Sequence, residues 1–155
     1  MNVHLMTSSL LFLDIDGVMN TTESCLRNRS GLVFTREAVA ALREIVRVCD
    51  CRIVISSTRR SAGLAALRTT FIRNDLAEVA ARIIGITPAM VEHDTDDWRE
   101  DEIAAWLDGH AYKGKLAICD DKPFSGPMRR FLILTDQEIG LTPALARRVA
   151  ALLQG

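Results

Sequence analysis

Five short apolar runs alternate along the chain with stretches of helical pattern, and this alternation constrains the fold more than any other feature. The runs that are typical of strands are residues 10–16, 51–57, 82–87, 115–121 and 130–136. The stretches with helical periodicity or capping signals are residues 35–49, 61–71, 74–83, 96–110 and 141–154. Strands that alternate with helices favour an α/β fold with a mainly parallel sheet, here of about five strands.

The length and composition indicate a single globular domain. The 155 residues are 48% apolar and 25% charged, and no linker divides them, so we expect one domain over residues 1–155. The longest non-periodic segment, residues 18–34, is expected to be a loop or flap inserted after the first strand. The net charge of -1 gives no overall attraction to nucleic acid or to an anionic membrane. Asp14 breaks the first apolar run, which is then too short for a signal peptide or a membrane span, so we expect a cytoplasmic protein without a membrane partner.

Polar side chains gather where the predicted strands end. Ligands of an open parallel sheet bind outside the carboxyl ends of its strands. Asp14 and Asp16 end the first run, and residues i and i+2 of a strand face the same way, so their side chains should reach toward one point. The other candidates at strand ends are Ser56, Ser57, Arg59, Asp120 and Asp121.

The chemistry of these side chains predicts a metal site next to a phosphate site. Clustered carboxylates repel one another unless a cation joins them, and a set of oxygen ligands without His or Cys suits Mg²⁺. A serine hydroxyl and the backbone N–H groups of a strand-to-helix turn suit phosphate oxygens. One carboxylate would remain to attack phosphorus.

Three segments resemble motifs of the haloacid dehalogenase (HAD) superfamily of phosphatases. "FLDIDGV", "IVISST" and "AICDDKP" resemble its first, second and fourth motifs, in that order. More narrowly, "VISSTRR", "DDWREDEIAAWL", "ICDDKP" and "TDQEIGLT" resemble a small, cap-poor branch that includes HAD domains of RNA repair proteins. The resemblance implies a Rossmann-like three-layer sandwich with a minimal cap or none.

The resemblance also implies roles for individual residues. Asp14 would be the nucleophile, and Asp16 the general acid and then the base that activates water. Both would bind Mg²⁺, Asp16 through its backbone carbonyl. Ser56, helped by the amide of Ser57, would hold the phosphoryl group. Asp121 is the preferred acidic ligand of Mg²⁺, and Asp120 is the alternative or a supporting partner.

The third motif of the superfamily, a cation beside the nucleophile, has no single match in this chain. Arg99, Lys113 and Lys115 precede the fourth strand, and Arg59 follows the second. Arg99 matches the narrower branch, and Arg59 is the other phosphate-binding candidate. The sequence leaves the four alternatives open.

These observations predict a Mg²⁺-dependent phosphomonoesterase that acts through an aspartyl-phosphate on Asp14. The alternative is a catalytically weak or silent module of the same fold that binds phosphate or a nucleic-acid end. The chain has little room for a cap, so the phosphorylated substrate could be large, either a nucleic-acid end or a phosphoprotein. The oligomeric state stays open, as does a cap supplied by a partner.

Overall fold

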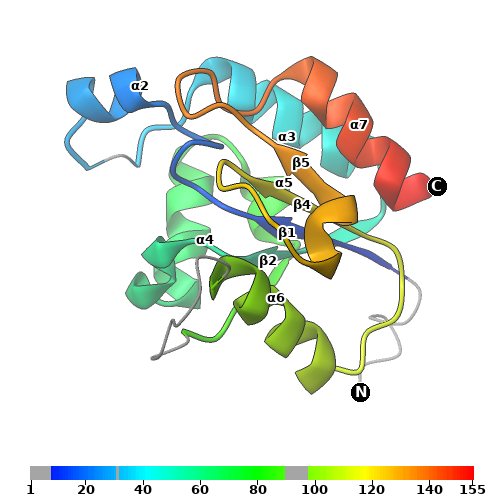
Figure 1. The fold of residues 1–155 in the computed structure, drawn as a ribbon. Helices are drawn as coiled ribbons and strands as arrows, with labels where there is room; N and C mark the ends of the chain where they lie inside the picture. Colours follow the sequence, from blue (N-terminus) through cyan, green and yellow to red (C-terminus); the bar gives the residue numbers. More distant parts are fainter. Residues whose placement is uncertain (1–7, 31, 90–97) are drawn as a thin grey trace.

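A five-stranded parallel sheet forms the centre of the protein (Figure 1). The structure is a computed structural model that describes residues 8–30, 32–89 and 98–155. Its strands lie in the order β3-β2-β1-β4-β5, and each neighbouring pair is parallel. Their bounds are β1 Ser9–Leu13, β2 Cys51–Ile55, β3 Ile83–Ile86, β4 Leu116–Asp120 and β5 Leu132–Leu134. The predicted α/β class and its strands are confirmed.

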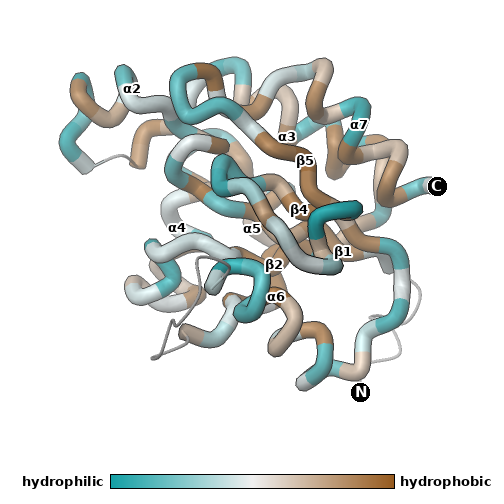
Figure 2. Tube along the Cα trace, viewed as in Figure 1, coloured by the Kyte–Doolittle hydropathy of each residue, from teal (hydrophilic) through white to brown (hydrophobic). Residues whose placement is uncertain are grey.

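Helices cover both faces of the sheet. The long helices are α3 Arg36–Val48, α4 Leu64–Arg73, α6 Trp98–Gly109 and α7 Pro143–Gln154, and the short ones are α2 Thr22–Arg27, α5 Ala77–Ala80 and the 3₁₀ helices η1 Thr58–Ala62 and η2 Pro127–Phe131. Leu11 and Leu13 of β1 pack toward α3, α4, α5 and α7, whereas Leu10 and Phe12 pack toward α6. The strands are mostly hydrophobic, as Figure 2 shows, because they lie between these two helical layers. The result is the predicted three-layer sandwich.

Two predicted helices begin at the expected residues because local capping fixes them. The hydroxyl of Thr35 accepts a hydrogen bond from the Ala38 amide, and that of Thr142 accepts one from the Leu145 amide. Such bonds satisfy amides that the first helical turn leaves free. The predicted start of the helix at residues 96–110 lies outside the described residues.

Several predicted elements have different bounds. The first strand ends at Leu13 rather than Asp16, because the chain then turns back on itself. The amides of Val18 and Met19 both donate to the Ile15 carbonyl, and Gly17 has φ +81°. The helix expected over residues 61–71 is divided at Gly63 into η1 and α4.

The segment 18–34, predicted as a loop, contains the helix α2. Its hydroxyl cap is reciprocal, because Thr21 accepts from the Ser24 amide while Ser24 accepts from the Thr21 amide. No residue of α2 is buried, and Leu26 is 78% exposed. A helix without a buried face lacks the apolar periodicity that indicates helices, so the pattern could not predict it.

Candidate active site

Asp14 lies at the centre of the carboxyl edge of the sheet, directly after β1. Its side chain is buried, with 3% of the residue exposed, and one carboxylate oxygen accepts a hydrogen bond from the Ile15 amide at 2.8 Å. Because β1 lies between β2 and β4, the residues that follow those two strands are its neighbours. The turn after Leu13 therefore carries a carboxylate to the point where three strand ends meet.

Two acids from the end of β4 lie beside Asp14. One carboxylate oxygen from each of Asp14, Asp120 and Asp121 falls within 4.8 Å of the others. These three residues form the carboxylate cluster. Asp136, the acid after β5, is exposed and caps its own turn by accepting from the Glu138 amide. The cluster therefore draws on β1 and β4 alone among the described strands.

The two acids of β4 have different surroundings. Asp120 is fully buried, and its carboxylate accepts hydrogen bonds from Arg99 at 3.1 Å and from the Lys122 amide at 2.9 Å. Asp121 is half-buried, and its carboxylate makes no hydrogen bond or ion pair with the residues that the structure describes. Asp121 is therefore the acid of this pair with free oxygens to offer a metal, while Asp120 already holds a cation.

Arg99, in the first turn of α6, is the cation beside Asp14. Its Nη1 lies 3.2 Å from Asp14 Oδ1 and 3.1 Å from Asp120 Oδ2, and it also donates to the Ser56 carbonyl. The side chain of Arg99 is 6% exposed. One guanidinium thus joins the ends of β1, β2 and β4.

The other three candidate cations lie elsewhere. Lys115 donates to the Gln154 and Gly155 carbonyls at the end of α7, and Lys113 is exposed on the preceding loop. Arg59 binds Asp16 rather than Asp14. Of the four candidate cations, Arg99 is therefore the one that contacts Asp14.

Asp16 does not join the carboxylate cluster, contrary to the expectation that both acids reach one point. Arg59 binds it through Nε and Nη2, at 2.9–3.0 Å, and Asn20 Nδ2 donates to it at 2.9 Å. The expectation assumed a straight strand through Asp16, whereas the chain turns after Leu13. Burial raises the pKa of Asp16, but hydrogen bonds from Arg59 and Asn20 outweigh this effect and lower the pKa overall.

Burial raises the pKa of two carboxyls of the cluster. It raises the pKa of Asp14 to about 6, against the opposing charge of Arg99. Burial together with the charge of Asp14 raises the pKa of Asp120 to about 8. A carboxylate cluster of this kind favours a bound cation, because a cation stabilises the charged form of each group.

Ser56 and Ser57 follow β2 and are fully buried. The hydroxyl of Ser56 has no hydrogen-bond partner among the described residues. Ser57 instead caps η1, since its hydroxyl accepts from the Arg59 amide at 3.1 Å. A buried hydroxyl without a partner costs free energy, so Ser56 is suited to bind an incoming oxygen.

Gly17 is the position at which the turn after β1 touches the end of β4. A Cβ there would lie 2.3 Å from Asp121 Oδ2. On its other side, the hydroxyl of Thr135 donates to the Gly17 carbonyl at 2.7 Å, which ties the turn to β5. The absence of a side chain at Gly17 lets Asp121 lie close to the turn that carries Asp14.

The sequence did not single out two buried or half-buried contributors to the site. Asn20 holds both the Gly17 amide and the Asp16 carboxylate. Glu100 is buried and accepts from the amides of Gly126 and Met128, so it holds the loop that follows Asp121. Glu100 adjoins Arg99 in the sequence, and an acid in a first helical turn is usually exposed, which is why the pattern did not mark it.

A comparison with families of known proteins identifies the relatives of this site. Residues 10–146 match the family described as "HAD domain in Swiss Army Knife RNA repair proteins". The chain belongs to this family. The match spans the carboxylate cluster, Arg99 and both serines, and it confirms the HAD resemblance. No curated protein and no solved structure matches the chain.

The family supports a phosphoesterase-like activity of the HAD type, and its description comes from proteins of RNA repair. HAD domains in general depend on Mg²⁺, and the carboxylate cluster offers oxygen ligands alone. Across the described residues, no helix is long and apolar enough to cross a bilayer.

Proposed function

We propose that the chain is a Mg²⁺-dependent phosphomonoesterase that forms an aspartyl-phosphate on Asp14. One observation carries the proposal: the buried Asp14 carboxylate lies between the Arg99 guanidinium and two further acids within 4.8 Å. A structural ion pair needs one acid, whereas here Arg99 contacts two acids and a third, Asp121, lies within 4.8 Å of both. The excess of negative charge is what a divalent cation and a phosphoryl group together would balance.

The first half of the reaction uses Asp14 and Asp16. An oxygen of Asp14 attacks phosphorus, the bond from phosphorus to the leaving-group oxygen breaks, and Asp16 gives that oxygen a proton. The Ser56 hydroxyl and the Ser57 amide hold the transferred group, and Arg99 balances its charge. The product of this half is an aspartyl-phosphate and a free alcohol.

In the second half, Asp16 takes a proton from water, and the water oxygen attacks the phosphorus of the aspartyl-phosphate. Inorganic phosphate leaves and Asp14 is regenerated. Mg²⁺ held by Asp14, Asp121 and the Asp16 carbonyl would neutralise charge on the phosphoryl oxygens. Arg99 holds Asp120 and Asp14 in place throughout, so that both keep their positions relative to the Ser56 backbone.

Asp16 must exchange a partner before it can act as an acid. Its contacts with Arg59 stabilise the carboxylate, which lowers its pKa and disfavours the protonated form. An incoming substrate that attracts Arg59 would release the Asp16 side chain. We therefore assign Arg59 to substrate binding and Arg99 to the nucleophile.

The first experiment measures phosphate release from an aryl phosphate with and without Mg²⁺. A panel of nucleotides, sugar phosphates and phosphate-ended oligonucleotides follows, because a generic substrate can miss a selective enzyme. Asp14→Asn should abolish turnover, while Asp136→Asn, the matched strand-end control, should leave it unchanged. Acid-quenched enzyme examined by mass spectrometry should carry phosphate on Asp14.

A second pair of variants tests the assignment of the cation. Arg99→Met should lower kcat about 10²- to 10³-fold, as the loss of one preorganised donor does elsewhere. Lys115→Met should leave kcat unchanged. Turnover that survives Asp14→Asn, or that needs no Mg²⁺, would refute the mechanism, and absence of turnover on the whole panel would favour a silent phosphate-binding module.

A further inference from the structure

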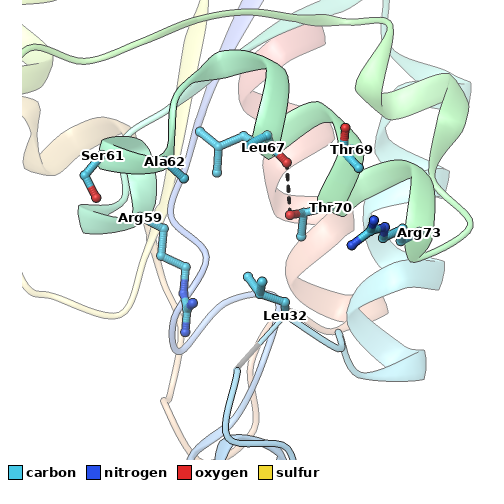
Figure 3. A pocket seen from close by; sticks show the side chains of 9 residues that line it. Leu32, Arg59, Ser61, Ala62, Leu67, Thr69, Thr70 and Arg73 are labelled. Carbon is cyan, nitrogen blue, oxygen red and sulfur yellow. Dashed lines mark hydrogen bonds between the residues drawn. The ribbon is translucent and has the colours of Figure 1, made fainter.

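A groove adjoins the site on the side of Arg59, between η1, α4 and Leu32. It encloses about 580 Å³. Figure 3 places Arg59 and Arg73 on opposite sides of it, with Leu67 and Thr70 of α4 above and Leu32 below. Arg59 also binds Asp16, so the groove begins at the catalytic carboxylates.

The charge of this groove is positive. Among the residues that the structure describes, the charged side chains lining the groove are Arg59 and Arg73, and none is a carboxylate. Arg73 is exposed and makes no ion pair or hydrogen bond through its side chain with any residue that the structure describes. An arginine that faces an open groove and has no acidic partner is free to bind an anionic ligand.

A second cavity, of about 350 Å³, touches the same catalytic residues but has the opposite charge. Asp16 and Asp121 line it, and its described lining residues include no Lys or Arg. A chain that carries several phosphates would be repelled there. A polyanionic leaving group would therefore leave the site through the arginine groove.

The lining of the groove includes an apolar part, here called its floor, which is formed by Ala62, Ala66, Leu67 and Leu32, the last of them 38% exposed. Ser61, Thr69 and Thr70 add hydroxyl groups to the lining. Single-stranded nucleic acids bind proteins through a cationic track for the backbone and apolar or planar surfaces for the bases. The ten residues of α4 rise about 1.5 Å each, so the helix offers a track of roughly 15 Å along the groove.

We propose that this groove binds the single-stranded nucleic acid that adjoins the reacting terminal phosphate, with Arg73 contacting a phosphodiester and the apolar floor contacting a base. The inference rests on the proposed function, because it takes the terminal phosphate to lie at Asp14. A phosphopeptide fits less well, since it offers one phosphate and its backbone amides would meet no carboxylate among the described residues of the groove. A phosphodiester chain repeats its negative charge and so matches both arginines.

The test measures binding and turnover separately. A short fluorescent single-stranded RNA with a terminal phosphate is titrated, by anisotropy, into the Asp14→Asn protein, which should bind it without hydrolysis. In that background Arg73→Gln should weaken binding about two- to fivefold, as the loss of one exposed charge contact does. The slope of log K against log salt should fall by about 0.7, the value for one phosphate contact of a single strand.

Two matched controls separate the groove from general effects of charge and folding. Arg147→Gln removes an exposed arginine of α7 and should change neither quantity. Ala66→Glu places an acid on the groove floor and should weaken binding at least as much as Arg73→Gln. Ala65→Glu, at the neighbouring exposed position outside the groove lining, should weaken it less.

Turnover in the catalytically intact protein distinguishes the proposal about the groove from the proposed phosphatase function. Arg73→Gln should raise KM for the phosphorylated RNA and leave kcat/KM for an aryl phosphate unchanged. RNA binding that is insensitive to Arg73 and Ala66, or tighter binding of a phosphopeptide, would overturn the groove assignment even if the enzyme is a phosphatase. Arg73-dependent binding without any phosphatase activity would overturn the proposed function and keep the groove.

Discussion

Replacing Gly17 with alanine tests how closely the turn after Asp14 packs against the acids at the end of β4. A Cβ would lie 2.3 Å from Asp121 Oδ2 and 2.6 Å from its Cγ, both far inside van der Waals contact. The backbone at Gly17, with φ +81°, also lies in the left-handed region that alanine disfavours. The substitution therefore carries two separate costs.

The two costs can be added from general values. Left-handed backbone costs an alanine about 1–2 kcal/mol, and forcing a carbon into a filled site costs about 1–3 kcal/mol. Gly17→Ala should thus lower the free energy of unfolding by about 2–5 kcal/mol. Because the collision is with Asp121, the variant should also displace that carboxylate and weaken the thermal stabilisation that we expect from added Mg²⁺.

A double-mutant cycle in urea separates the two costs. In an Asp121→Gly background the collision is absent, so Gly17→Ala should cost only the strain of about 1–2 kcal/mol. The coupling free energy between the two positions should then be about 1–3 kcal/mol. Gly109→Ala is the matched control, since nothing lies within 4 Å of a Cβ there. Additivity of the two changes within about 0.5 kcal/mol would refute the proposed contact.

Three further predictions concern the carboxylates and one helix cap. Without metal, stability should fall from about pH 5 to about pH 8. The raised pKa values of Asp14, about 6, and Asp120, about 8, let the folded state hold protons that the unfolded chain has released. Melting temperatures measured in the presence of a chelator test this. Glu100→Gln should cost about 1–3 kcal/mol in urea denaturation, because a carboxylate that accepts from two amides is lost. Thr35→Ala should cost about 1 kcal/mol in the same assay without changing kcat.

Each of these predictions has its own control. Asp120→Asn should flatten the pH dependence, and a profile that it leaves unchanged would contradict the assignment. Glu100→Gln should speed proteolysis near Gly126, and unchanged proteolysis would mean that the loop is held by other contacts. Thr35→Ser keeps the hydroxyl and should restore most of the stability lost in Thr35→Ala.

The sequence predicted those parts of the fold that local chemistry determines. Thr35 and Thr142 mark helix starts because a side chain caps its own first turn, which needs no tertiary contact. The convergence of Asp14, Ser56 and Asp120 followed from a general property of parallel sheets, whose carboxyl ends meet at one edge.

The parts that could not be predicted depend on tertiary geometry. Arg99 reaches Asp14 because α6 begins beside the ends of β1 and β4, and no spacing in the sequence encodes that placement. Asp16 turned to Arg59 because the strand ends three residues earlier than its apolar pattern indicated. Helix α2 was not predicted because it has no buried residue and therefore no apolar face.

The first turn of α6 carries two consecutive residues that face different parts of the site. Arg99 forms ion pairs with Asp14 and Asp120, while Glu100 accepts hydrogen bonds from the amides of Gly126 and Met128. Any displacement of α6 would therefore move Arg99 and the loop after Asp121 together, because both are held by adjacent residues of one helical turn. The position of α6 is thereby coupled to the carboxylate cluster and to the loop after Asp121 at the same time.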